Sequence, residues 1–180
     1  MLLNGTALAQ TVEEVTVTAA RKEQSVQDVA ISVQAITSED LQLGHIETAD
    51  DLTSTIPGFD FTEALGGGVV IKIRGLTMVT IGSAITEAGI TAQNGHHINN
   101  RPFSTTGFYD ADRIEILEGP QGTLYGRNST TGLINFITAK PGADQYLALT
   151  AGADGLSQFK LARDFELSDT VAMRIAATKY

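Results

Sequence analysis

The segment from Ile114 to Pro141 constrains the fold of this chain more than any other part of the sequence. It consists of two short runs of alternating apolar residues around a glycine-rich centre, IEILEGPQGTLYGRNSTTGLINFITAKP. Alternation with a period of two is typical of β-strands that have one buried face. Glycine is entropically costly to order, so this density marks backbone that bends through positive φ or packs closely against a neighbour. The segment therefore predicts two strands joined by a tight bend.

Composition narrows the class of protein. The chain has 180 residues with 42% hydrophobic residues, enough for one ordinary domain with its own core and some additional chain. The net charge of −9 excludes a nucleic-acid partner, because phosphates require a basic surface. The sequence has no cysteine, which removes disulfides, Cys-ligated zinc and thiol chemistry. It contains no apolar run of about 18 residues, so it predicts no transmembrane helix.

Short strands and short helices alternate in the middle of the chain, which predicts an α+β fold with a small mixed β-sheet. The strands are expected at 31–37, 59–62, 69–73, 89–94, 114–117 and 133–138. A first helix is expected to begin at Ser38 and end at Gly44, and a second to begin at a capping box at Thr48. Residues 76–89 and 96–110 are expected to be long loops.

Beyond Pro141-Gly142 the pattern changes to longer alternating segments at 146–153, 158–165 and 171–180. Transmembrane β-barrel strands need about 9–11 residues of such two-faced alternation, although soluble hairpins fit nearly as well. A barrel with an open edge in lipid leaves backbone groups unpaired. We therefore expect an N-terminal fragment whose residues 144–180 form the first antiparallel strands of a truncated transmembrane β-barrel.

The N-terminal residues indicate export followed by an extended segment. Ala7-Leu8-Ala9 has the small-x-small form of a signal-peptidase site, so residues 1–9 are expected to be the remnant of a signal peptide. The β-branched residues that follow favour a strand, for which no partner is expected nearby, and residues 22–28 are expected to be a polar linker. We call this segment the leader strand; it comprises Val12, Glu13, Glu14, Val15, Thr16, Val17 and Thr18.

These features together resemble the plug domain of TonB-dependent outer-membrane receptors. The resemblance rests on the runs at 73–75, 112–120, 125–128 and 135–141, and the leader strand looks like the family's TonB box. It implies a TonB box and linker at 10–28, a plug domain at 29–143 and the start of the barrel at 144–180. The chain departs from the family at Ala92-Gln93-Asn94-Gly95, where Tyr-x-Asp-Gly is common.

The resemblance implies a gated importer in the outer membrane of a Gram-negative bacterium. The plug would close the protein's own β-barrel, which would contact the outer-membrane lipid, because a wide barrel cannot be filled by its own side chains. The solute would be scarce and bulky, such as siderophore-bound iron, cobalamin or an oligosaccharide. The C-terminal domain of TonB, in the periplasm, would bind the leader strand by β-augmentation.

The resemblance also implies roles for individual side chains. Arg74, Glu118 and Arg127 are expected to contact the barrel wall. Adjacent histidines on extended backbone point to opposite sides, so His96-His97 does not predict a metal site. The expected contacts of the solute are His96, His97, Asn99, Asn100, Arg101 and Phe103.

Two other functional classes are alternatives to transport. The glycine-rich turn lacks the GxxxxGK[ST] pattern of a phosphate-binding loop, and no local signature of a Ser-His-Asp triad appears. The sequence thus predicts no enzyme, no catalytic residue and no cofactor. The other alternative is a signalling or binding module of the outer membrane that uses the plug fold without transport.

Overall fold

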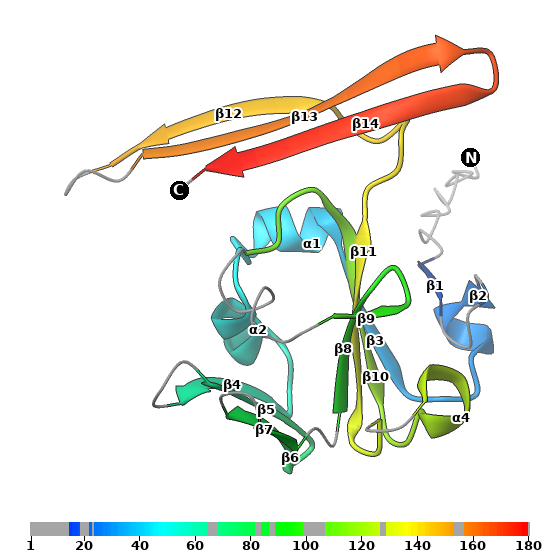
Figure 1. Cartoon of the computed structure of the whole chain (residues 1–180), viewed down its shortest axis with the longest axis vertical. Coiled ribbons are helices and arrows are strands. Elements are labelled where there is room, and N and C mark those ends of the chain that lie inside the picture. Colours follow the sequence, from blue (N-terminus) through cyan, green and yellow to red (C-terminus); the bar gives the residue numbers. More distant parts are fainter. Residues whose placement is uncertain are drawn as a thin grey trace, which may run out of the picture.

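A five-stranded mixed sheet with the strand order β3-β10-β11-β8-β9 forms the centre of the structure (Figure 1). This computed structural model describes residues 15–18, 22, 24–64, 68–81, 84–86, 89–98, 107–126, 129–152 and 157–179. The sheet strands are β3 (Val33–Thr37), β8 (Gly89–Gln93), β9 (His96–Ile98), β10 (Ala111–Glu118) and β11 (Gly132–Thr138). β8 runs parallel to β11 and every other pairing is antiparallel, so the predicted small mixed sheet is confirmed.

The β10–β11 pair is the product of the glycine-rich segment. Ile116 lies opposite Ile134, and Glu118 lies opposite Gly132, where the bend closes. Gly132 has a φ of 150°, and a Cβ placed there would lie 2.5 Å from the carbonyl oxygen of Leu117. Only glycine fits such a close backbone approach. The bend also contains a short helix that the sequence did not predict, α4 (Gly122–Tyr125).

Two short helices cover one side of the sheet, as Figure 1 shows, and both begin near the positions predicted for them. They are α1 (Ser38–Leu43), which ends at Gly44, and α2 (Ala49–Thr55). Apolar side chains of β10 and β11 meet the helices in one core. Its fully or almost fully buried members include Ala49, Leu52, Ile71, Ile114, Ile116 and Ile134.

A second antiparallel sheet of four strands, β4-β5-β6-β7, packs beside α2. Its strands are β4 (Phe59–Ala64), β5 (Gly68–Ile73), β6 (Leu76–Ile81) and β7 (Ala84–Thr86). The prediction of a loop over 76–89 was therefore wrong. The predicted loop over 96–110 was also wrong at its start, where the chain forms β9. Arg74 and Gly75 have φ values of 51° and 77°, the pattern of a two-residue hairpin turn. Residues 76–81 have too weak an alternation to predict a strand, but this turn brings them onto β5.

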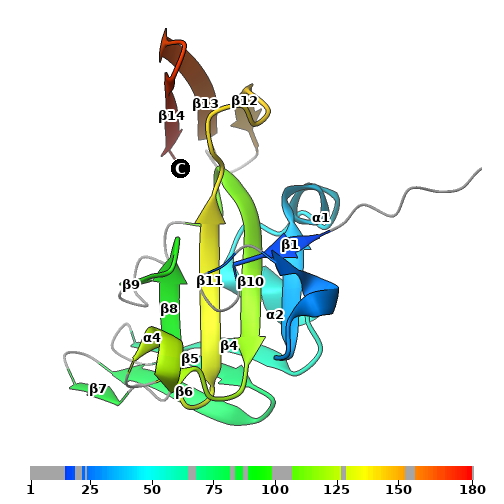
Figure 2. The same ribbon diagram turned by 90° about the vertical axis from the view of Figure 1, so that its right-hand side faces the viewer.

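Residues that follow β11 form a third sheet, which lies beyond the end of that strand (Figure 2). Its antiparallel strands are β12 (Tyr146–Ala151), β13 (Ser157–Ser168) and β14 (Val171–Lys179). One face carries exposed apolar side chains, among them Leu149, Met173 and Ile175, whereas Arg174 faces the plug and is buried. The predicted alternation is thus present, and its assignment to a membrane barrel stays a prediction.

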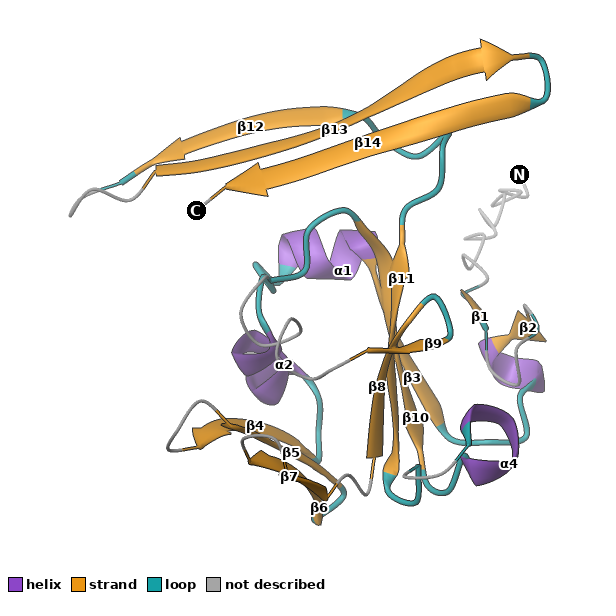
Figure 3. Ribbon diagram, in the orientation of Figure 1, coloured by secondary structure: helices purple, strands orange, loops and turns teal. Residues whose placement is uncertain are grey.

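Figure 3 shows that strands dominate the molecule and that its helices are short. Within the described ranges, none of the helices has the length and apolarity needed to cross a membrane.

The start of α2 is held by one carboxylate. Asp51 accepts hydrogen bonds from the backbone N–H groups of Glu47 at 3.0 Å and Thr48 at 2.8 Å, and from the Thr48 hydroxyl at 2.9 Å. Partial burial acts to raise the pKa of Asp51, but these hydrogen bonds outweigh it, and the pKa is lowered from 3.8. A carboxyl with a depressed pKa contributes stability above its unfolded pKa and loses it as the pH falls through the folded value.

We expect Asp51→Ala to lower the free energy of unfolding by about 0.5–2 kcal/mol at pH 7, because capping hydrogen bonds are lost. The matched control is Asp50→Ala in the same first turn, which is exposed and should change stability much less. Denaturant titrations at pH 7 and below pH 3.8 measure both. Equal losses for the two variants at pH 7, or a difference that does not shrink as the pH falls below 3.8, would contradict this account of the cap.

Candidate functional site

The leader strand is paired within the described structure, contrary to the prediction of a lone strand. β1 (Thr16–Val17) runs antiparallel to β2 (Gln24–Ser25), and the 3₁₀ helix η2 (Val26–Asp28) follows. The N–H of Val26 donates to the carbonyl of Val15 at 3.0 Å. Residues 22–28 are therefore not simply a linker, because the chain turns back there and satisfies backbone groups of β1. Val12, Glu13 and Glu14 lie outside the described residues.

Val17 fastens the leader strand to the sheet through apolar packing. Its side chain is completely buried in a cluster with Ala92, Leu117 and Leu133. Val33 and other partly buried apolar residues surround this cluster. Burial of a side chain of this size stabilises the docked state by about 1.5–3 kcal/mol. The leader strand therefore lies on the sheet face opposite α1 and α2 (Figure 1).

The next residue is held by a buried carboxylate. Glu115 is completely buried. Its Oε1 accepts the backbone N–H of Thr18 at 2.7 Å, and its Oε2 accepts the Thr18 hydroxyl at 2.7 Å. The Tyr125 hydroxyl donates to the Thr18 carbonyl at 3.3 Å. We call these residues, together with Arg113 and Asn135, the leader clasp.

The other two members of the leader clasp, Arg113 and Asn135, donate hydrogen bonds to the Glu115 carboxylate. Arg113 Nε donates to Oε1 at 2.8 Å, and Asn135 Nδ2 donates to Oε2 at 3.1 Å. An isolated carboxylate in this position would carry a large desolvation penalty, which paired charge and hydrogen bonds offset. When Thr18 leaves this position, the carboxylate loses two short hydrogen bonds. The leader clasp therefore favours the docked leader strand without any covalent link.

Asn135 also connects the leader clasp to the β8–β9 turn. Its Oδ1 accepts the N–H of Gly95 at 2.9 Å, while its Nδ2 also donates to the Thr18 hydroxyl at 3.2 Å. His96 and His97 follow Gly95 directly and are exposed. Their predicted contact with solute stays a prediction. The other predicted solute contacts lie outside the described residues: Asn99, Asn100, Arg101 and Phe103.

Arg74 and Glu118 form an ion pair with each other. Glu118 is nearly buried and also accepts from Ser32 at 2.5 Å and Gln34 at 2.9 Å, whereas the Arg74 side chain is 62% exposed. The pair joins the end of β10 to the start of β3 and to the β5–β6 turn. Both partners belong to the plug, so their contact with a barrel wall remains a prediction, and Arg127 lies outside the described residues.

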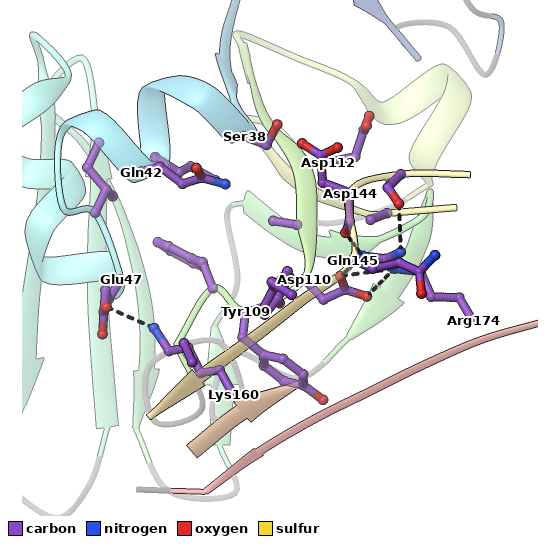
Figure 4. Close-up of a pocket in the computed structure, with 18 of the residues that line it drawn as sticks. Ser38, Gln42, Glu47, Tyr109, Asp110, Asp112, Asp144, Gln145, Lys160 and Arg174 are labelled. Carbon is purple, nitrogen blue, oxygen red and sulfur yellow. Dashed lines mark hydrogen bonds and ion pairs between the residues drawn. The ribbon is translucent and has the colours of Figure 1, made fainter. Parts of the chain in front are cut away.

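The β12–β14 sheet meets the rest of the structure through charged side chains that sequence reasoning missed (Figure 4). Arg174 Nη2 lies 2.7 Å from Asp110 Oδ1, and Lys160 Nζ lies 2.8 Å from Glu47 Oε1. The hydrogen bond from Lys160 lowers the pKa of Glu47, against a smaller opposing effect of burial. These residues line a cleft of about 650 Å³. One feature of the sequence pointed to this contact: the alternation of residues 171–180 places Arg174 on the less apolar face of its strand.

Across the described residues, no group of three or more acidic or histidine side chains could hold a metal ion.

Comparison with known proteins identifies the family. The sequence model of the TonB-dependent receptor plug domain matches residues 25–133. Among curated relatives, the vitamin B12 transporter BtuB of Vibrio vulnificus is 28% identical over 150 residues, 81% of this chain and 24% of that protein. The iron-regulated outer membrane virulence protein of Vibrio cholerae is 30% identical over 78% of this chain and 22% of that protein. The chain thus spans about a quarter of the length of these relatives.

Solved structures agree on the fold. The ferric yersiniabactin uptake receptor FyuA from Yersinia pestis has a TM-score of 0.70 and 20% identity, over 82% of this chain and 24% of that chain. The ferripyoverdine receptor of Pseudomonas aeruginosa has a TM-score of 0.72 and 20% identity, over 91% of this chain and 22% of that chain. The chain belongs to the plug-domain family of TonB-dependent receptors, whose members are receptors and transporters rather than enzymes, in the outer membrane of Gram-negative bacteria.

We expect Thr18→Val to loosen the leader strand, because it removes a hydroxyl that binds the buried Glu115 carboxylate. Loss of a hydrogen bond to a buried charged group costs about 1–3 kcal/mol. Hydrogen exchange at the Val17 amide should therefore accelerate by roughly tenfold or more. Thr16→Val makes the same chemical change at an exposed position of β1 and serves as the control. Equal exchange rates in both variants would contradict the role of the leader clasp.

Proposed function

We propose that this chain forms the gating plug and the first wall strands of an outer-membrane importer driven through TonB. Membership of the plug-domain family supports the receptor class. The observation that carries the coupling is the docked leader strand, a terminal segment held on the sheet by one buried valine and one buried carboxylate. Such a segment can leave the sheet without unfolding the core that α1 and α2 cover.

Energy coupling then proceeds by strand exchange. Among the described residues, β1 pairs with β2 over two residues, and the Val26 N–H adds a bond to the Val15 carbonyl, so the leader strand is engaged by a short and replaceable partner. A sheet edge of the TonB C-terminal domain would offer a longer pairing in its place. Such pairing relies on backbone geometry more than on side chains, which leaves Glu13 and Glu14 free to vary. Tension applied by TonB would then pass along the chain into β3.

The solute is proposed to be bulky and scarce: siderophore-bound iron, cobalamin or an oligosaccharide. The first two classes are supported by the names of relatives, which include a vitamin B12 transporter and the ferric aerobactin receptor of Klebsiella pneumoniae. Growth of a deletion strain on each candidate solute as the limiting nutrient, with and without functional TonB, tests the proposal. Growth that depends on the protein and on TonB supports import, whereas binding without uptake favours the signalling or binding module.

We expect Val15→Pro to abolish uptake by the complete receptor while leaving solute affinity unchanged. Proline removes a backbone donor and restricts the preceding residue, which prevents regular strand pairing. Val15→Thr keeps the N–H and the β-branched shape and is the matched control. Uptake of labelled solute and equilibrium binding are measured on the same cells. Normal uptake by the proline variant would show that the leader strand is not the TonB contact.

We expect neutralisation of Arg74 or Glu118 to loosen the plug, with Glu118→Gln the more severe change. Glu118 is nearly buried and binds Ser32 and Gln34 as well as Arg74, whereas exposed ion-pair partners such as Arg74 contribute little. The readout is entry of a large antibiotic through the outer membrane, with Glu63→Gln, a change of an exposed side chain on β4, as the control. Permeability equal to wild type in both the Arg74 variant and the Glu118 variant would contradict the role of this ion pair in holding the plug.

A further inference from the structure

The turn between β8 and β9 consists of Asn94 and Gly95, a pair with a reactivity of its own. Asn94 has a φ of 50° and Gly95 a φ of 78°, the two positive values of the hairpin turn that Asn-Gly favours. Because glycine has no Cβ, its backbone nitrogen is open to the side chain of the residue before it. An asparagine followed by glycine is for this reason especially prone to spontaneous deamidation.

Deamidation at this turn needs no enzyme and no co-reactant except water. The Gly95 nitrogen gives up its proton to a solvent base and bonds to Cγ of Asn94. The bond from Cγ to Nδ2 then breaks, and Nδ2 leaves as ammonia. The cyclic succinimide takes up one water at either of its two carbonyls and becomes aspartate or isoaspartate. In isoaspartate the main chain runs through Cγ, which lengthens the backbone by one carbon.

The fold engages the attacking nitrogen of this reaction. The Gly95 N–H donates to Asn135 Oδ1 at 2.9 Å. Asn135 is completely buried, and its Nδ2 donates to the Glu115 carboxylate at 3.1 Å, so its Oδ1 stays turned toward Gly95. A backbone N–H that is bound in this way loses its proton to solvent only when the structure opens locally.

The amide that would be attacked is held as well, by Thr138 at the end of β11, the strand beside β8 (Figure 2). Asn94 Oδ1 accepts the Thr138 N–H at 3.1 Å, and Asn94 Nδ2 donates to the Thr138 hydroxyl at 3.0 Å. The Asn94 N–H donates to the Phe136 carbonyl at 2.8 Å. These bonds direct the side chain toward β11, whereas cyclisation requires Cγ to turn back onto Gly95. Asn94 is exposed, so burial does not protect it.

We propose that Asn94 is a deamidation site that Asn135 and Thr138 keep inactive in the folded plug, because they hold the two reacting groups apart. Conversion then requires the β8–β9 turn to open. Isoaspartate would displace Gly95 from Asn135 and shift the two exposed histidines that follow, whereas aspartate keeps the backbone and still accepts the Thr138 N–H. None of these contacts involves TonB or a solute, so the site stands independently of the proposed function.

The test is ageing of the complete, purified receptor in mildly alkaline buffer, followed by peptide mass spectrometry that separates aspartate from isoaspartate. A synthetic peptide of residues 89–98 contains the same pair without the contacts of the fold. Asn94 should convert in the receptor at most about one-tenth as fast as in the peptide, because only the open fraction reacts. Asn94→Gln needs a larger ring, and the loss of the signal in this variant assigns it. Equal rates in receptor and peptide would overturn the proposal.

Thr138→Val removes the hydroxyl that binds the Asn94 amide and keeps the backbone N–H. Loss of one such hydrogen bond should speed conversion of Asn94 by roughly two- to tenfold. Thr138→Ser is the matched control, since it retains the hydroxyl and should convert at the rate of the wild type. Thr138 lies at the partly exposed end of its strand, so both variants are expected to fold. Equal rates in the two variants would overturn the proposal.

Asn135→Ala tests the second contact, because it removes the acceptor of the Gly95 N–H. Conversion of Asn94 should approach the rate of the peptide, and hydrogen exchange at the Gly95 amide should accelerate in parallel. Asn135 also binds Glu115, so circular dichroism is recorded on the same sample to show that the variant is folded. A folded variant with faster exchange at Gly95 but an unchanged rate of deamidation would overturn the proposal. If the variant does not fold, the Thr138 pair decides the question.

Discussion

The antiparallel ladder of β10 with its neighbours is the interaction on which the other features of the plug depend. One face of β10 places Ile114 and Ile116 in the core under α1 and α2, and the other places Glu115 and Leu117 under the leader strand. Because side chains alternate along a strand, a shift of one residue would exchange these faces. It would bury an unpaired carboxylate under the helices and leave Thr18 without its acceptor. The close approach of Gly132 to Leu117 helps to fix this register.

The two faces of the central sheet are held by different kinds of contact. The helical side is an apolar core, which gains free energy in proportion to its buried area. The leader side combines one small apolar cluster with a buried, hydrogen-bonded carboxylate. Buried charge pairs contribute little net stability, yet they are sensitive to the loss of a single partner. This composition suits the strand exchange that we propose for the leader strand.

Charged contacts with the third sheet have a different character. Arg174 binds two carboxylates and two backbone carbonyls at a single corner, while Lys160 and Glu47 form a partly exposed pair beside it. In the antiparallel strands β12–β14, this arginine faces Asp110, and the opposite face carries exposed apolar side chains such as Leu149, Met173 and Ile175. Such a two-faced sheet matches a wall with lipid on one side and a plug on the other, as its family membership leads us to propose.

The sequence alone determined the local elements and the family. Alternation predicted strands and the capping box at Thr48 predicted a helix, because each of these signals depends on neighbours in the chain. The same local signals were too weak to show β6, β7 and β9, whose pairing is supplied by adjacent strands. Only the tertiary structure decided that β1 pairs with β2, that Glu115 binds Thr18 and that Arg174 binds Asp110. These contacts join residues up to 97 positions apart, and no periodic pattern encodes which buried charge will meet which distant donor.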